Sequence, residues 1–582
     1  MPEPESSPDQ SLSPVLLAPI EPTSSGVQLT STDTEKDPDV KERKGHHGHR
    51  KNQLHREVSE EELEHVEVRG IARRFVVSRP RALQYTYHDQ VISNVVRDEE
   101  MAFRRSARPE LSDLSREDSE ESHHHHHHDP GNAEGIAKSR ERVDLFIDLI
   151  WVGIISNLSE VYSALFFDPE QSQGLAVGVF IIAFTASWRI WNILREFMSN
   201  YYMDDVLQRL FIFWILVLSV FYGNQLAYLP EDIEKYKHYV IILYLFIRAS
   251  FAAMEAIYAI FIPWLRWVCV FHTVLMLPAV GLWIAGMELK GNKALGPILC
   301  ALVWEYFVPV ALDTKVANRL TPNQYRKALD PRHFQSRFAS FFILAVGEGV
   351  LQLISRGPLG VGITGTAAVS VWSLNIYFII SFLYFNRDQS KYYIPAVRRK
   401  GWRVLLWVSF HIPLFSSFLT LASSVMFMLR NHAQLPENVD QNDEKVPAED
   451  LRDYIYSSMW TMSVSLSIIL ISMTCLALLD KSLDPPGTLR VNNRYVRLSG
   501  RIVYVVVILT VPIKKDLSMD LYLGIAGVMM SFLTSWEWVV SLEKGGSFFE
   551  PRGLTAILSS NRRAKKQFSS VPDAIRPNNE GA

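Results

Sequence analysis

The chain from about residue 144 onward consists of apolar runs separated by short polar segments. Most of these runs are near 20 residues long, which is enough for a helix to cross a hydrocarbon core of about 30 Å. Pro512 and Lys514 cut short the eleventh run, and without it eleven spans would remain. The pattern predicts twelve transmembrane helices, at about 144–166, 174–197, 205–228, 238–262, 264–286, 294–313, 335–355, 362–385, 403–429, 453–479, 499–513 and 519–541.

The first 136 residues show the opposite pattern. Of the 31 Phe, 22 Tyr and 14 Trp residues, only Phe75, Tyr85, Tyr87 and Phe103 precede residue 137. Such a segment buries too little apolar surface to offset the conformational entropy of the chain. We therefore predict an all-α polytopic membrane protein with a disordered polar tail (1–136), a transmembrane domain (137–545) and a basic C-terminal tail (546–582).

Positive charge alternates between successive polar segments. Lys and Arg gather before the first run, in the segments after runs 6, 8 and 10, and in the C-terminal tail, whereas the segment after run 9 is acidic. Because cytoplasmic loops carry an excess of Lys and Arg, this alternation favours twelve spans with both termini in the cytoplasm.

A weak internal repeat relates the two halves of the apolar region. Residues 142–146 (RVDLF) open run 1 and residues 337–341 (RFASF) open run 7, and Trp188 to Asp204 matches Trp372 to Asp388 with identical spacing. The matched runs differ by six in order, an even number. A duplication would therefore be parallel, as in some transporters.

The remaining composition excludes several classes of protein. A net charge of −3 argues against a nucleic-acid binder, and three cysteines cannot form a disulfide framework. Cys269, Cys300 and Cys475 lie in apolar runs, where we expect core packing. The run His123–His128 could chelate a metal but has no fixed geometry, so we predict no metal site and no cofactor.

Ionisable side chains inside the apolar runs are the candidate functional residues. Each costs about 2.5 kcal/mol or more at membrane depth, so each is expected to serve a purpose. Carboxylates and histidines suit a proton or cation pathway, although they equally suit a polar bundle core. The set is Asp148, Glu160, Arg189, Arg248, Glu255, His272, Glu305, Glu348 and His411.

Glu348 is the central member of this set. It lies near the middle of its run between two glycines, which allow a close approach by another backbone or an ion. The alternative is a neutral glutamic acid hydrogen-bonded to a neighbouring helix. The five acids of the set exceed Arg189 and Arg248, so some acids must be protonated, bind a cation or pair with histidine, and Arg248 could be a structural counter-ion.

Three further charged residues near the ends of their runs favour structural interpretations. Asp144 is expected to pair with Arg140 or to cap its helix. Arg195 and Glu537 are expected to extend their charged groups toward the membrane surface.

Four motifs follow one another along the apolar region. They are RVDLFIDLIWV at 142–152, MDDV at 203–206 followed by Arg209-Leu210, HF at 333–334 with RF at 337–338 and LAVGE at 344–348, and HIP at 411–413. Together these motifs resemble the bacterial low temperature requirement A family over roughly residues 138–540. By this resemblance, Asp148, Arg337, Glu348 and His411 are family-pattern positions, and the long N-terminal tail is similar to fungal members. Asp144, Gln335-Ser336 and Gly349 depart from the pattern. The resemblance implies a multipass membrane protein and no particular substrate.

Two functional hypotheses follow. The first is a transporter or conductor of a proton, a cation or a small solute linked to one. The alternative is a non-transporting sensor or scaffold that recruits a protein partner through its N-terminal tail. An intramembrane enzyme is not favoured, because the usual hydrolase, metalloprotease and P-loop patterns are absent. One G-x-G-x-x-G, at Gly360–Gly365, opens an apolar run without a preceding strand.

Overall fold

A computed structural model describes most of the apolar region. The predicted tail up to residue 129, the His123–His128 run and the C-terminal segment 546–582 lie outside the described residues. Those residues are 130–201, 205–261, 266–312, 331–355, 365–387, 390, 393–398, 401–432, 448–484, 487, 489–514, 517–542 and 544.

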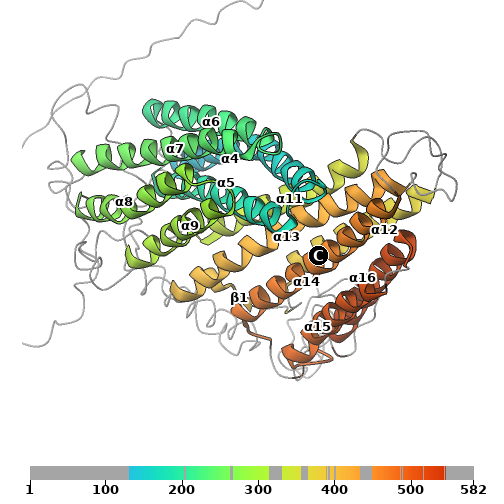
Figure 1. Cartoon of the computed structure of the whole chain (residues 1–582). Coiled ribbons are helices and arrows are strands. Elements are labelled where there is room, and N and C mark those ends of the chain that lie inside the picture. The colour runs from blue at the N-terminus through green and yellow to red at the C-terminus, as the bar shows by residue number, and fades with distance from the viewer. Residues whose placement is uncertain are drawn as a thin grey trace, which may run out of the picture. The chain divides into compact units, whose positions relative to one another are not determined.

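Twelve long α-helices account for nearly all of this described part, which confirms the all-α prediction (Figure 1). The first helix begins at Pro130, so its first seven residues fall within the segment predicted as a tail. The helices are α4 (Pro130–Phe166), α5 (Gln173–Tyr201), α6 (Val206–Ala227), α7 (Ile233–Phe261), α8 (Arg266–Glu288), α9 (Asn292–Leu312), α11 (Pro331–Ile354), α12 (Gly365–Asn386), α13 (Gly401–His432), α14 (Ala448–Leu479), α15 (Arg494–Thr510) and α16 (Met519–Val540).

Eleven of these helices are long and apolar enough to cross a membrane over their described residues. The run interrupted by Pro512 is among them, because α15 continues into a short 3-10 helix, η5 (Val511–Ile513), that contains this proline. The helix outside the eleven is α9. Its 21 residues nevertheless extend about 31 Å at 1.5 Å per residue, close to the thickness of the hydrocarbon core.

Helices pack in the same order in the first six and in the last six. In the first half the contacting pairs include α4–α5, α4–α6, α5–α9, α6–α7, α7–α8 and α8–α9. The corresponding pairs α11–α12, α11–α13, α12–α16, α13–α14, α14–α15 and α15–α16 are also in contact. This is the arrangement that a parallel duplication predicts. The matched tryptophans differ, since Trp188 packs on α11 and α13 and Trp372 packs on α16.

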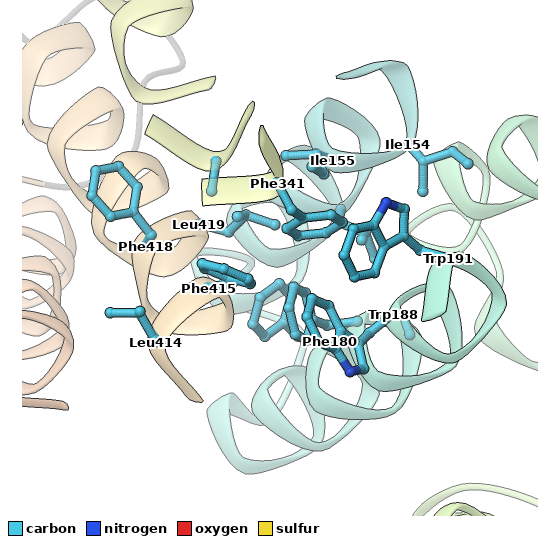
Figure 2. Close-up of a cluster of buried hydrophobic side chains, with 14 of the residues drawn as sticks. Ile154, Ile155, Phe180, Trp188, Trp191, Phe341, Leu414, Phe415, Phe418 and Leu419 are labelled. Carbon is cyan, nitrogen blue, oxygen red and sulfur yellow. The ribbon is translucent and has the colours of Figure 1, made fainter. Parts of the chain in front are cut away.

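An aromatic cluster joins the two halves (Figure 2). Trp188 and Trp191 of α5 face Phe341 of α11 edge-on, with ring centroids 5.1 and 4.7 Å apart. Phe415 of α13 closes the cluster at 5.1 Å from Phe341. Edge-to-face aromatic contacts of this kind add to the energy of burial. The cluster therefore fixes α5 against α11 and α13.

Small and hydroxyl-bearing residues allow the helices to approach closely. Trp372 lies directly on Gly527 of α16, where a Cβ atom would come within 2.5 Å of the indole ring. Between α4 and α13, the Ser159 and Ser423 hydroxyls lie 2.8 Å apart, and Ser423 also donates to the Ser159 carbonyl. Such contacts replace the hydrophobic driving force that lipid cannot provide between helices.

A short β-ladder connects two of the loops. Strand β1 (Tyr393–Ile394), after α12, pairs antiparallel with β2 (Lys481–Ser482), after α14. The next turn, the 3-10 helix η4 (Ala396–Arg398), begins where the Ala396 amide donates to Asp480 at 2.7 Å. These bonds join the end of α12, the start of α13 and the end of α14.

Candidate functional site

Asp148 forms a two-pronged ion pair with Arg337. The guanidinium donates to both carboxylate oxygens at 2.8 and 2.7 Å, and both side chains are buried. Because α11 begins at Pro331, Arg337 lies within this helix and not in the preceding loop. A bidentate pair fixes geometry as well as charge, so it joins α4 of the first half to α11 of the second.

Asp144 extends this pair into a buried cluster. Its carboxylate lies 2.8 Å from Nε2 of His333 and 3.5 Å from Nε of Arg337. The expectation that Asp144 caps its helix is wrong, because α4 begins fourteen residues earlier, at Pro130. The side chain is one turn before Asp148 on the same face of α4. Both acids therefore face the start of α11.

Glu305 of α9 forms ion pairs with Arg189 of α5 and Arg248 of α7. Arg248 lies 3.3 Å and Arg189 3.8 Å from its Oε2 atom. Tyr244 donates to Oε2 at 2.6 Å and Trp283 donates to Oε1 at 2.9 Å. Arg248 is therefore a counter-ion of Glu305. With four donors directed at it, the Glu305 carboxylate is the centre of a buried polar network.

Glu255 and His272 form a separate pair between α7 and α8. The carboxylate lies 2.8 Å from Nδ1 of the imidazole, and both side chains are partly exposed. This contact provides one of the acids with a histidine partner, which is one of the three outcomes expected from the excess of acids.

Glu348 differs from Asp148, Glu255 and Glu305 because no described cation lies within ion-pair distance of it. It is only 3% exposed. Its Oε1 atom accepts from Gln352 at 2.7 Å and from Ser156 of α4 at 3.3 Å. Its Oε2 atom has no hydrogen-bond partner within the described part of the chain. A buried carboxylate oxygen without a donor is costly, so Oε2 is an atom at which a proton, a cation or a water molecule would be stabilising.

A polar cavity of about 210 Å³ surrounds this carboxylate between α4, α11 and α13. The hydroxyls of Ser156, Ser159 and Ser423 line it, and Gln352 donates to Ser159 at 2.8 Å. This leaves the Gln352 Oε1 atom, like Glu348 Oε2, without a described partner. The cavity therefore offers two acceptor oxygens among hydroxyl groups, which is the ligand chemistry of a hard cation or a water-bound proton.

Glu160 and Arg430 lie at the edge of the same cavity. Glu160 is exposed at its position near the end of α4, one helical turn beyond Ser156. The two candidate acids of this region thus line one cavity, although they come from runs far apart in the sequence.

The region from α4 to α16 matches a known protein family. The family model described as bacterial low temperature requirement A protein (LtrA) matches residues 141–540, more than half of the chain. The chain belongs to the LtrA family. A search of curated proteins and a search of solved structures each find no match.

The LtrA motif positions gather where the two halves meet. Asp148 and Arg337 form the bidentate pair, and Glu348 lies on the same helix as Arg337. His411 is buried in α13, with Nδ1 2.7 Å from the Trp407 carbonyl and Nε2 3.2 Å from the Tyr384 hydroxyl. In this LtrA protein the four residues expected from the resemblance therefore take part in contacts of α4, α11, α12 and α13.

Two LtrA-domain residues expected to reach the membrane surface are buried instead. Arg195 donates to Asn192 at 2.9 Å, and its guanidinium carbon lies 4.2 Å from the centre of the Phe334 ring. Glu537 accepts from Arg501 at 2.6 and 2.9 Å, and both are at most 2% exposed. The snorkelling interpretation is wrong for both, because packing provides each with a partner inside the bundle.

Sequence reasoning missed several polar partners in this LtrA chain. Gln352, Ser156, Ser159 and Ser423 were not candidates because neutral residues are common in membrane helices. The available signal was spacing, since Glu348 and Gln352 are four residues apart on one face.

The three cysteines differ in burial. Cys269 is buried as expected, whereas Cys300 is exposed on α9, so its expected core packing is wrong. Within the described ranges, no group of three or more His, Cys, Asp or Glu side chains is placed to hold a metal ion.

Proposed function

We propose that this LtrA protein transports or conducts a proton or a cation, or a small polar solute linked to one, and that Glu348 binds the ion. The observation that carries the proposal is the buried Glu348 side chain, which is 3% exposed and lines a polar cavity, and whose Oε2 atom has no described hydrogen-bond partner. A group that is unfavourable both as a bare anion and as a permanently buried acid suits reversible binding.

The other candidate acids support this choice by elimination. Asp148 is engaged by Arg337, Glu305 by Arg189 and Arg248, and Glu255 by His272. These pairs account for the charges that sequence alone left in excess. Glu348 and Glu160, which share the cavity, are the members of the set that remain for an ion.

The orientation of the protein is part of the proposal. The distribution of basic segments favours a cytoplasmic location for both termini. With that orientation α11 and α13 begin at the cytoplasmic side, because each follows a basic segment. The Glu348 cavity, near the ends of α11 and α13, then faces the opposite side of the membrane.

Ion flux in proteoliposomes tests the proposal. Purified wild-type protein should dissipate an imposed proton, Na⁺ or K⁺ gradient, measured with an entrapped ion-sensitive dye. Glu348→Gln keeps the size and hydrogen-bonding capacity of the side chain but removes its charge, so flux should fall to the level of empty liposomes. Glu348→Asp should retain part of it.

The matched control is Glu288→Gln, which removes a carboxylate from the exposed end of α8 and should leave flux unchanged. All variants should elute from size-exclusion chromatography as the wild type does. Equal flux in wild type and Glu348→Gln would contradict the assigned site. Absence of flux in the wild-type protein under all three gradients would favour the sensor or scaffold hypothesis. The N-terminal tail on which that hypothesis depends lies, up to residue 129, outside the described part of the chain.

A further inference from the structure

A second cavity lies at the opposite ends of the same helices. It measures about 370 Å³ and is bounded by the starts of α11 and α13 and the ends of α12 and α14. Its polar lining includes Gln335, Ser336, Tyr384 and His411. His411 is thus the second member of the candidate set, after Glu348, that is buried and lines a cavity between α11 and α13.

The two cavities are separated along both helices. On α11, Ala339 lines the second cavity and Glu348 lines the first, nine residues or about 14 Å further along. On α13, His411 and Ser423 are twelve residues apart, about 18 Å. The cavities therefore approach the middle of the bundle from opposite ends.

Aromatic rings fill the region between them. Tyr377 lies on Gly349, next to Glu348, and its ring is 5.5 Å from that of Phe418. Phe418, which Figure 2 shows on α13, is 6.2 Å from Phe342, and Phe342 stacks on Tyr384 at 3.8 Å. Phe342 and Phe418 are fully buried. This row of rings separates the carboxylate from the imidazole.

A hydrogen bond holds the last ring of the row. Nδ1 of His411 faces the Trp407 carbonyl, an acceptor, so this nitrogen carries the hydrogen. The neutral imidazole then accepts at Nε2 from the Tyr384 hydroxyl, 3.2 Å away. Two residues later, Pro413 lacks the N–H that would bond to the Ser409 carbonyl, which weakens α13 beside this contact.

We propose that the His411-lined cavity is the opposite entrance of the Glu348 pathway and that the stacked Phe342–Tyr384 pair is its closed gate. This inference rests on the proposed function and adds its second entrance and its barrier. The solute passing the gate would be small and polar, because the Glu348 cavity measures only about 210 Å³ and is lined by hydroxyl, amide and carboxylate groups.

Cysteine accessibility tests the two entrances without relying on transport. In a background carrying Cys269→Ser, Cys300→Ser and Cys475→Ser, we would introduce Ser156→Cys in the first cavity or Ala339→Cys in the second. A charged maleimide that cannot cross the bilayer would be added to one side of oriented vesicles at a time. Each cysteine should react from one side only, and the two sides should be opposite.

The matched control on α11 is Ile343→Cys, four residues after Ala339, on a side chain that is 56% exposed toward lipid. It should react from neither side. Reaction of Ser156→Cys and Ala339→Cys from the same side, or failure of Ala339→Cys to react from either, would overturn the second entrance. If each cysteine reacts from one side only but ion flux is the same in the wild type and in Glu348→Gln, the proposed ion site is refuted and the two entrances remain supported.

Truncation of the gate tests the barrier. Phe342→Ala should raise ion leak several-fold and should make Ala339→Cys reactive from both sides. Phe378→Ala removes the same side chain from a lipid-facing position on α12 and should do neither. A folded Phe342→Ala protein with wild-type leak and one-sided labelling would overturn the gate.

Discussion

Arg337 and Asp148 lie 189 residues apart in sequence and meet through two hydrogen bonds of 2.8 and 2.7 Å. The pair is buried between α4 and α11, where the two halves of the LtrA domain are in contact. Because both oxygens of Asp148 are taken, this carboxylate is better suited to holding the halves together than to carrying an ion.

Removal of either partner should destabilise the protein strongly. Arg337→Gln should cost about 3–5 kcal/mol, because it leaves the buried Asp148 carboxylate without its counter-ion. Asp148→Asn should cost less, because Asp144 remains 3.5 Å from the Arg337 guanidinium. The double variant should lose less than the sum of the two. Thermal unfolding in detergent, followed by tryptophan fluorescence, measures this coupling. Additive losses would show that the pair does not act as a unit.

Loss of Glu305 should destabilise the protein more than loss of one of the arginines that surround it. Glu305→Gln leaves both guanidinium groups without their carboxylate and should lower the unfolding temperature markedly. Arg189→Gln should have a smaller effect, because Arg248 lies closer, at 3.3 against 3.8 Å, and remains to balance the charge. The same unfolding measurement applies. A larger loss from Arg189→Gln than from Glu305→Gln would contradict the central role of Glu305.

Two glycines on α16 provide a matched test of helix packing. Gly527→Ala would bring a Cβ atom within 2.5 Å of the Trp372 ring, so it should cost about 1–3 kcal/mol through overpacking. In Gly524→Ala, one turn earlier, the nearest indole atom would be 3.8 Å away, an ordinary contact. Unfolding temperatures should therefore fall for the first variant and stay near wild type for the second. Equal values would mean that α12 and α16 adjust freely.

Arg501 should not tolerate replacement by lysine. The guanidinium is fully buried and donates to both oxygens of Glu537 and to the Arg387 carbonyl. A lysine retains the charge but cannot match this planar set of donors. Arg501→Lys should cost about 1–3 kcal/mol through unsatisfied buried acceptors. Arg490→Lys, on an exposed loop residue, should leave the unfolding temperature unchanged.

Much of the fold could be predicted from the sequence because hydrophobic length is a local property. The run predicted at 499–513 became α15 and η5, which together end at Ile513 as predicted and begin five residues earlier, at Arg494. The same local reasoning failed for Arg195 and Glu537. Their distance from the ends of their runs was visible, but the helices that cover them were not.

The candidate site was predictable only in part for a similar reason. Glu348 stood out because a charged residue between glycines is unusual in an apolar run. Its cavity depends on Ser156 and Ser423, which approach it only once α4, α11 and α13 are packed. Likewise, the local sequence does not show that both oxygens of Asp148 are occupied, whereas Oε2 of Glu348 has no described partner.

The β1–β2 ladder restricts how the second half can deform. Its backbone pairing and the Ala396–Asp480 bond tie together the chain leaving α12, the chain entering α13 and the chain leaving α14. Tyr384 of α12 and His411 of α13 both lie on helices whose ends these hydrogen bonds connect. A displacement of one of these helix ends would therefore displace the other two, so that α12, α13 and α14 move together. Separation of the Phe342 and Tyr384 rings would then require α11 to move relative to these three helices.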